Sequence, residues 1–319
     1  MLSISETPPL RHLLSRIGYS THRFNTILVG LKTVADGMGD GGAIAVTWTK
    51  PRNKNEAESA ASSARSFACS GAMVLAVDVL DAFLRELAEQ DWLKFKPETV
   101  RIATKAHTRP KAQGGAYSVA ERAEALADDL GIDDSQTIAL IELFAKWRNV
   151  VAHNAERVSQ LEDRFRKKLE ENSTQIGAGH SHFSVTLGIT NFEKRAIPVP
   201  KEVTSLMANA VRFARAVDEA AIKRVASTSD EVQSAADWLL SDWFKKNVDI
   251  AHAMIADGLQ GPNDRRVKSI TKWLANAGVS NSKNAVSATL AETYRSDLAA
   301  LSKKQFCERL GIQLIEAGR

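Results

Sequence analysis

Apolar residues recur at helical spacing through most of the 319-residue chain. In the segment 55–90 the repeating positions are Met73, Val77, Leu80, Leu84 and Leu87. Steps of three and four residues place such side chains on one face of an α-helix, and that face packs against the rest of the protein. Similar stripes predict helices at 119–131, 135–151, 157–172 and 202–226, with a short one at 10–17. The pattern therefore predicts a mainly α-helical protein.

Two segments depart from helical spacing and predict minor β elements. Residues 43–48 are apolar and partly β-branched, and Pro51 ends the run. Residues 180–190 alternate within a glycine-rich region that ends in prolines. The chain after residue 230 has the pattern of helices joined by short turns. We predict an N-terminal extension with a short strand (1–54), a helical domain with a small β insertion (55–229) and a C-terminal helical bundle (230–319).

Composition describes an ordinary globular protein and excludes several classes. Hydrophobic residues make up 44% and charged residues 25%, which is ample for a core. The net charge of +4 is compatible with a polyanionic partner but does not identify one. Cys69 and Cys307 are too far apart to suggest a metal site or a disulfide framework, so no metal or other cofactor is predicted. Because neither a signal peptide nor a long apolar span is evident, we expect a cytoplasmic protein with no membrane partner.

The segment KWRNVVAHN, residues 146–154, closes a predicted helix with groups suited to phosphate chemistry. Arg148 offers a fixed fork of donors that matches a phosphate. His153 titrates near neutral pH and can remove or deliver a proton. Asn149 adds a neutral donor and acceptor. Together they could hold a phosphodiester and take a proton from a ribose 2′-hydroxyl without a metal ion.

These residues resemble the signature of the HEPN family, an arginine followed by a polar residue and, after four to six positions, by a histidine. The resemblance covers about residues 55–172 and implies an α-helical bundle in which the motif ends a long helix. It also implies a metal-independent endoribonuclease that works on RNA as a homodimer, with two motif copies facing one cleft. Many family members are toxins or antiphage effectors, so a cognate antitoxin or defence-system partner is a further implication.

The bare pattern occurs three times, and its position in the chain distinguishes the copies. The pairs are Arg16 with His22, Arg101 with His107, and Arg148 with His153. Only the last ends a strong amphipathic helix. Five positions on a regular helix rotate by about 140°, so Arg148 and His153 would converge only if the helix ends or kinks near Val151, or if two chains share a cleft.

A simpler interpretation stays open for the same residues. Cations in the last turn of a helix interact well with its dipole and its free carbonyls, and Arg148 and His153 could do only that. Asp78, Asp81 and Glu142 could be auxiliary acids near the motif, or merely solvated carboxylates on a helical bundle.

The segment 263–294 supplies an alternative function of another class. Basic groups within two turns could contact phosphates, and an adjacent ring could stack on a base. These candidate nucleic-acid-binding residues are Arg265, Arg266, Lys268, Lys272 and Trp273. A glycine turn followed by NAVSATL resembles a helix-turn-helix, which would make the protein a non-catalytic DNA-binding regulator. A helical hairpin with a solvated basic face, in a partner-binding scaffold, explains the same residues.

Overall fold

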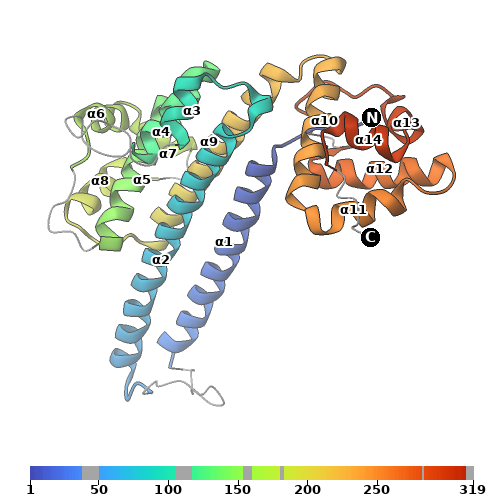
Figure 1. Cartoon of the computed structure of the whole chain (residues 1–319). Helices are drawn as coiled ribbons and strands as arrows, with labels where there is room; N and C mark the ends of the chain where they lie inside the picture. Colours follow the sequence, from blue (N-terminus) through green and yellow to red (C-terminus); the bar gives the residue numbers. More distant parts are fainter. Residues whose placement is uncertain (38–49, 105–116, 154–159, 180–182, 282–283, 314–319) are drawn as a thin grey trace. The chain divides into compact units, whose positions relative to one another are not determined.

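The computed structural model describes residues 1–37, 50–104, 117–153, 160–179, 183–281 and 284–313, and these are mainly α-helical. The elements, labelled in Figure 1, are β1 (Ser3–Ile4), α1 (Pro8–Ala35), α2 (Lys54–Ala88), η1 (Asp91–Leu93), α3 (Pro97–Thr104), α4 (Val119–Leu130), α5 (Ser135–His153), α6 (Asp163–Glu171), α7 (Ser173–Gly179), α8 (Val185–Glu193), α9 (Pro200–Val225), α10 (Ser229–Lys246), α11 (Val248–Gly258), α12 (Asn263–Ala277), β2 (Val279–Ser280), α13 (Tyr294–Ala300) and α14 (Lys303–Leu310).

The chain forms two compact units that are each discontinuous in sequence. The motif unit comprises His12–Glu86 and Pro97–Arg215. The terminal unit comprises Met1–Arg11, Leu87–Lys96 and Ala216–Arg319. This division differs from the three consecutive parts predicted at 1–54, 55–229 and 230–319. Helices α1, α2 and α9 each contribute to both units, and a linear sequence pattern gives no sign of such a split.

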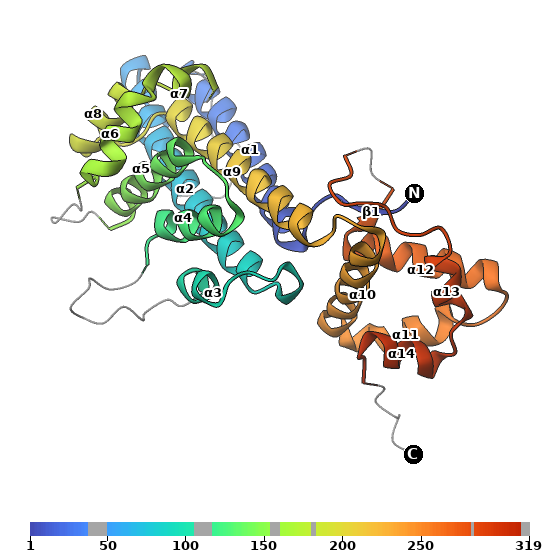
Figure 2. The same ribbon diagram turned by 90° about the horizontal axis from the view of Figure 1, so that it is seen from above.

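In the motif unit, α2 lies beside α1 and α9 in both Figure 1 and Figure 2. The apolar stripe predicted for α2 is buried along its whole length, from Met73 at 0% exposure to Leu87 at 0%. The facing stripe of α9 is buried as well, including Met207 and Phe213. Burial of such side chains is the main favourable term in folding, so these long helices form the core that positions the other elements.

Local sequence fixes α4 and the turn that leads from it into α5. Ser118 and Glu121 form a capping box at the start of α4, and Gly131 ends that helix at φ 69°. A positive φ costs glycine little, which allows the chain to turn directly into α5. At the other end of α5, the indole of Trp147 is fully buried and donates to the carbonyl of Ala196 at 2.9 Å. The helix that carries the motif is thereby anchored at both ends.

The terminal unit is organised around an aromatic cluster. The rings of Phe244, Trp273 and Phe306 meet edge to face, with centroids 5.3 Å apart for Phe244–Trp273 and 5.8 Å for Trp273–Phe306. Such pairs add to the burial of their area. The two short strands pair antiparallel, with Ile4 opposite Val279, and join the two ends of this unit.

Several sequence predictions are corrected by the structure. The β element predicted at 180–190 is wrong for the described residues, because Val185–Glu193 is helix α8, capped by Ser184. Ser184 is a favoured helix N-cap residue, and alternation over a short glycine-rich run does not separate a strand from a capped helix. The short helix at 10–17 is the 28-residue α1. The strand predicted at 43–48 lies outside the described residues.

Among the described residues, one helix is long and apolar enough to cross a bilayer, although no such span was evident in the sequence. Its 18-residue window in α2 has a mean hydropathy of 1.8, and 50% of that window is buried within the protein. The core helix of a folded domain meets the same criterion, and α2 is such a helix. We conclude only that α2 is unusually apolar.

Packing around Trp273 predicts a site sensitive to small changes. A Cβ added at Gly258 would overlap the Trp273 ring, so Gly258→Ala should lower the free energy of unfolding by about 1–3 kcal/mol. Gly71 on α2 is the matched control, because an added Cβ meets nothing there. Gly71→Ala should therefore keep or raise stability, as expected for alanine in an exposed helix. Chemical denaturation of both variants checks this, and a neutral Gly258→Ala would contradict the described packing.

Candidate functional site

The three motif residues lie in the last turns of α5, next to α2. Arg148 Nη2 donates to Asp78 Oδ1 of α2 at 2.6 Å, and Arg148 Nη1 donates to Asn149 Oδ1 at 2.9 Å. The side chain of Arg148 is 24% exposed and that of Asp78 is 49% exposed. The guanidinium is thus held from two sides at the surface of the motif unit, where a ligand could reach it.

The α5 backbone stays helical through His153, which bears on how the motif could assemble. The helix has no end before His153, which lies two positions after Val151. Positions 148 and 153 therefore lie about 140° apart around the axis of a regular helix. Arg148 is turned towards α2, and the side chain of His153 is outside the described set. Besides a kink of α5 near Val151, the route by which both residues could serve one cleft is a second chain.

The predicted auxiliary acids have three different environments. Asp78 contacts Arg148, as described above. Asp81, about one turn further along α2, is paired with Arg122 of α4 at 2.5 Å and with Arg85 at 2.7 Å. The side chain of Arg122 is only 4% exposed, so Asp81 offsets a buried charge. Asp78 is the one of these acids that combines contact with the motif and access to solvent.

Glu142 is buried inside the motif unit, at 1% exposure. Lys146, one turn along α5, lies 3.3 Å from its Oε1 as an ion pair, but neither carboxyl oxygen accepts a hydrogen bond within the described part of the chain. Burial raises the pKa of the Glu142 carboxyl above its ordinary value, although Lys146 acts in the opposite direction. A group so enclosed cannot touch RNA, so its effect is on stability.

The raised pKa of Glu142 predicts a pH-dependent stability change. The folded state binds the proton more tightly than the unfolded state, so this group's contribution falls as pH rises from its ordinary pKa of 4.5 through its raised value. Glu142→Gln should therefore raise the melting temperature at pH 7 and lose that advantage below about pH 4, where both states are protonated. Glu170→Gln, on the exposed face of α6, is the control. A pH-independent difference would contradict the assignment.

The other two arginine–histidine pairs do not form comparable sites. Arg16 and His22 are exposed in the middle of α1. Arg101 ends α3, where it binds Glu98 at 2.7 Å and the Tyr117 hydroxyl at 2.9 Å, and its predicted partner at position 107 lies outside the described residues. Among the three, Arg148 alone ends a long buried helix.

The predicted nucleic-acid interface at 263–294 is corrected in two respects. Trp273 is 2% exposed inside the aromatic cluster, so its ring is not free to stack on a base. Arg266 is half-buried and donates to the Leu301 carbonyl. Arg265, Lys268 and Lys272 are exposed on α12. Trp273 is thus a core position beside basic residues. Its helical spacing from Ile270 and Ala277, which are also buried, could have shown this from the sequence.

The helix-turn-helix predicted in the same segment is also absent from the described residues. Gly278 ends α12 at φ 110°, as a turn glycine would, but the chain then enters β2 rather than a second helix. The described residues between β2 and α13 are not helical. Their backbone instead bonds to the N-terminal segment, for example Leu290 N to Leu2 O at 2.8 Å. The described residues after Gly278 therefore supply no recognition helix for binding DNA.

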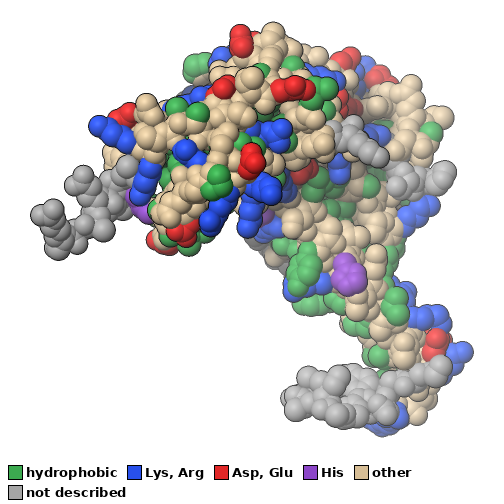
Figure 3. Space-filling view, turned by 90° about the vertical axis from the view of Figure 1, so that its right-hand side faces the viewer, with side chains coloured by type: hydrophobic (Ala, Val, Ile, Leu, Met, Phe, Trp, Pro, Cys, Tyr) green, Lys and Arg blue, Asp and Glu red, His purple; other side chains and the backbone are tan. Residues whose placement is uncertain are grey.

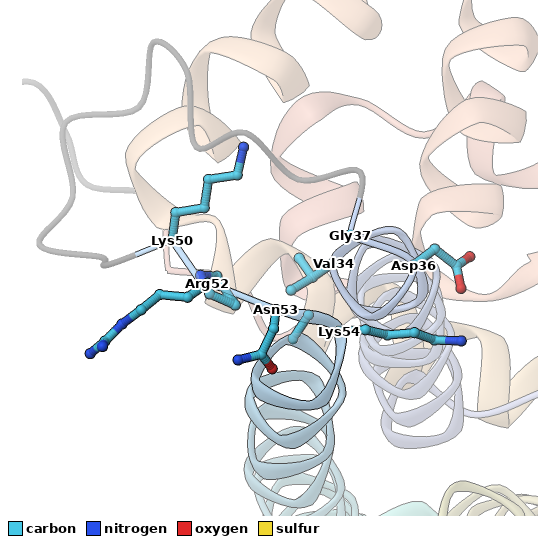
Figure 4. A pocket seen from close by; sticks show the side chains of 9 residues that line it. Val34, Asp36, Gly37, Lys50, Arg52, Asn53 and Lys54 are labelled. Atoms are coloured by element: carbon cyan, nitrogen blue, oxygen red, sulfur yellow. The ribbon is translucent and has the colours of Figure 1, made fainter.

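A cavity of about 350 Å³ lies at the end of the α1–α2 hairpin (Figure 4). Lys and Arg side chains gather at this end on the face seen in Figure 3. The first turn of α2 is already satisfied, because Glu56 accepts from Arg52 N at 2.8 Å and Asn53 accepts from Glu56 N at 2.9 Å. The Arg52 side chain points away from Val34 in Figure 4. Among the described residues that line the cavity, the Arg52 side chain does not converge with the others on a catalytic site.

Metal chemistry has no obvious site in the part of the chain that the structure describes. No group of three or more histidine, cysteine, aspartate or glutamate side chains there is arranged to hold an ion. Both cysteines are buried thiols, and burial raises the pKa of Cys69 to about 11.

A scan against protein-family models and searches of curated proteins and of solved structures found no match to this chain.

Proposed function

We propose that the protein is a metal-independent endoribonuclease in which Arg148, Asn149 and His153 form the catalytic motif. The observation that carries the proposal is the placement of Arg148 at the end of α5. Its guanidinium is held by Asp78 and Asn149 and is partly open to solvent. A guanidinium that only capped the helix would bond to the last free carbonyls of α5, whereas both described partners of Arg148 are side-chain oxygens. The resemblance of residues 148–153 to the HEPN signature gives the reaction class.

The proposed reaction is attack of a ribose 2′-hydroxyl on the adjacent phosphate. His153 removes the 2′-hydroxyl proton, the 2′-oxygen forms a bond to phosphorus, and the bond to the 5′-oxygen breaks. The leaving 5′-oxygen takes a proton, which gives a 2′,3′-cyclic phosphate and a 5′-hydroxyl. Arg148 binds the phosphate and offsets the extra negative charge of the transition state, and Asn149 orients the guanidinium through its Oδ1.

The active unit in this proposal is a homodimer. Positions 148 and 153 diverge on a regular helix, so residues of two copies would bring both groups to one cleft without a kink in α5. The face of α2 that carries Asp78 supports such an interface, because Phe67, about three turns before Asp78, is 82% exposed and Leu75 is 38% exposed. A two-fold dimer would bury it against the same surface of its partner.

The first prediction is that His153→Ala abolishes cleavage. Purified wild-type protein and the variant are incubated with total RNA in EDTA, and loss of general base catalysis should lower the rate by about 100-fold or more. His22→Ala is the control, since it removes the exposed histidine of another Arg-to-His pair, Arg16 with His22, on α1. Equal inactivity of wild type and variant would contradict the proposal. Equal activity would exclude His153 as the base.

The second prediction tests sharing of the cleft. A mixture of Arg148→Ala and His153→Ala chains, exchanged and re-associated, contains about half mixed dimers, each with one intact composite site out of two. The mixture should therefore recover about a quarter of wild-type activity, while each variant alone stays inactive. Sedimentation of the three samples confirms that they are dimers. Absence of recovery in mixed dimers would contradict a cleft built from two copies.

The competing function is a non-catalytic binder. It would be favoured if wild type leaves RNA intact but binds duplex DNA in a salt-sensitive way, and if substitutions of Arg265 and Arg266 weaken that binding. The missing recognition helix and the buried Trp273 argue against it. A toxin or defence role, with a cognate antitoxin or defence-system partner in the cytoplasm, rests on the family resemblance alone and forms part of the proposal.

A further inference from the structure

We propose that Asp78 is a positioning residue that sets the guanidinium of Arg148 for binding a phosphate. This inference rests on the proposed ribonuclease function and assigns it a residue on a second helix. The carboxylate comes from α2, 70 positions before Arg148 in the sequence, so no motif within α5 contains it.

The contact is specific to one edge of the guanidinium. Asp78 Oδ1 accepts from Nη2 at 2.6 Å, a length typical of a charge-assisted hydrogen bond. Asn149 Oδ1 accepts from Nη1, and Nε is buried without a hydrogen-bond partner among the described residues. The guanidinium plane is thus fixed at both terminal nitrogens, and each of these retains a second N–H. Those two N–H groups are the donors left for a phosphate oxygen.

The exposure of the pair indicates that stability is not its main consequence. Asp78 is about half exposed, and ion pairs of such exposure add little to folding. The adjacent pair on α2 is the opposite case, because Asp81 neutralises the buried Arg122. Two acids about one turn apart on one helix therefore hold arginines for different reasons. Asp81 stabilises the packing of α4 on α2, and Asp78 limits the motion of a side chain that faces solvent.

Fixing a long side chain before substrate binds lowers the entropy lost in the transition state. Without Asp78, Arg148 keeps its charge but gains rotamers, so phosphate binding should change little while the chemical step slows. The removed negative charge also weakens repulsion of RNA. Loss of Asp78 should therefore lower the cleavage rate at saturating RNA without raising the RNA concentration needed for half-saturation. A purely structural role would not produce this combination.

The test is single-turnover cleavage by wild type, Asp78→Ala and Asp78→Asn at a series of RNA concentrations. Asp78→Ala should lower the saturating rate by about tenfold, with half-saturation unchanged or reached at lower RNA. Asp78→Asn keeps an oxygen acceptor for Nη2 and should recover part of that loss. Glu124→Ala is the control, because it removes the carboxylate of a similarly exposed pair with Arg164 in the same unit. Melting temperatures of all variants show whether they are folded.

A second arm shows whether Asp78 acts through Arg148. In an Arg148→Ala background, Asp78→Ala should have no further effect on the residual rate, and an additional loss would overturn the proposal. Wild-type rates in Asp78→Ala, or faster cleavage, would also overturn it, since the pair would then be idle or restraining. If wild type itself does not cleave RNA, the ribonuclease proposal fails, and that outcome differs from a failure confined to Asp78.

Discussion

The contact between α5 and α2 at Arg148 and Asp78 is the interaction on which the proposed function of this protein depends. Helix α2 supplies a buried apolar face to the core of the motif unit and, on another side, a short row of acids. Helix α5 is held in the motif unit by the buried Trp147, which contacts Ala196 and Phe192, and by its packing against α4 and α6. The arginine at the end of α5 therefore reaches the protein surface in a defined orientation. A rigid scaffold that presents a polar group at its surface is the common design of binding and catalytic sites.

The helices were predictable where one face is apolar and the ends carry strong local signals. The stripe from Met73 to Leu87 and the turn at Gly131 follow from sequence spacing and from the conformational freedom of glycine. The motif itself was also visible, because Arg148, Asn149 and His153 lie within six positions of one another on α5. Asp78 could be suspected only as one acid among several, since its partner lies 70 positions away and no local rule connects α2 with α5.

The errors have physical causes as well. Trp273 looked like a stacking platform because basic residues surround it in sequence, yet on a helix it faces the opposite way, into Phe244 and Phe306. The segment after Gly278 looked like a second helix, but its backbone bonds to the N-terminal residues. Contacts between the two ends of a chain cannot be inferred from neighbouring residues. For the same reason, the division into two discontinuous units was outside the range of a sequence pattern.

The chemistry proposed for the motif leaves a distinctive product, which makes its end groups the most direct measurement. RNA fragments produced by wild-type protein in EDTA would be analysed by mass spectrometry and by 5′-end labelling with and without phosphatase. Attack by the 2′-hydroxyl predicts fragments that end in 2′,3′-cyclic phosphate and begin with a 5′-hydroxyl that accepts label directly. Fragments with 5′-phosphate and 3′-hydroxyl ends, or intact RNA, would contradict the central claim.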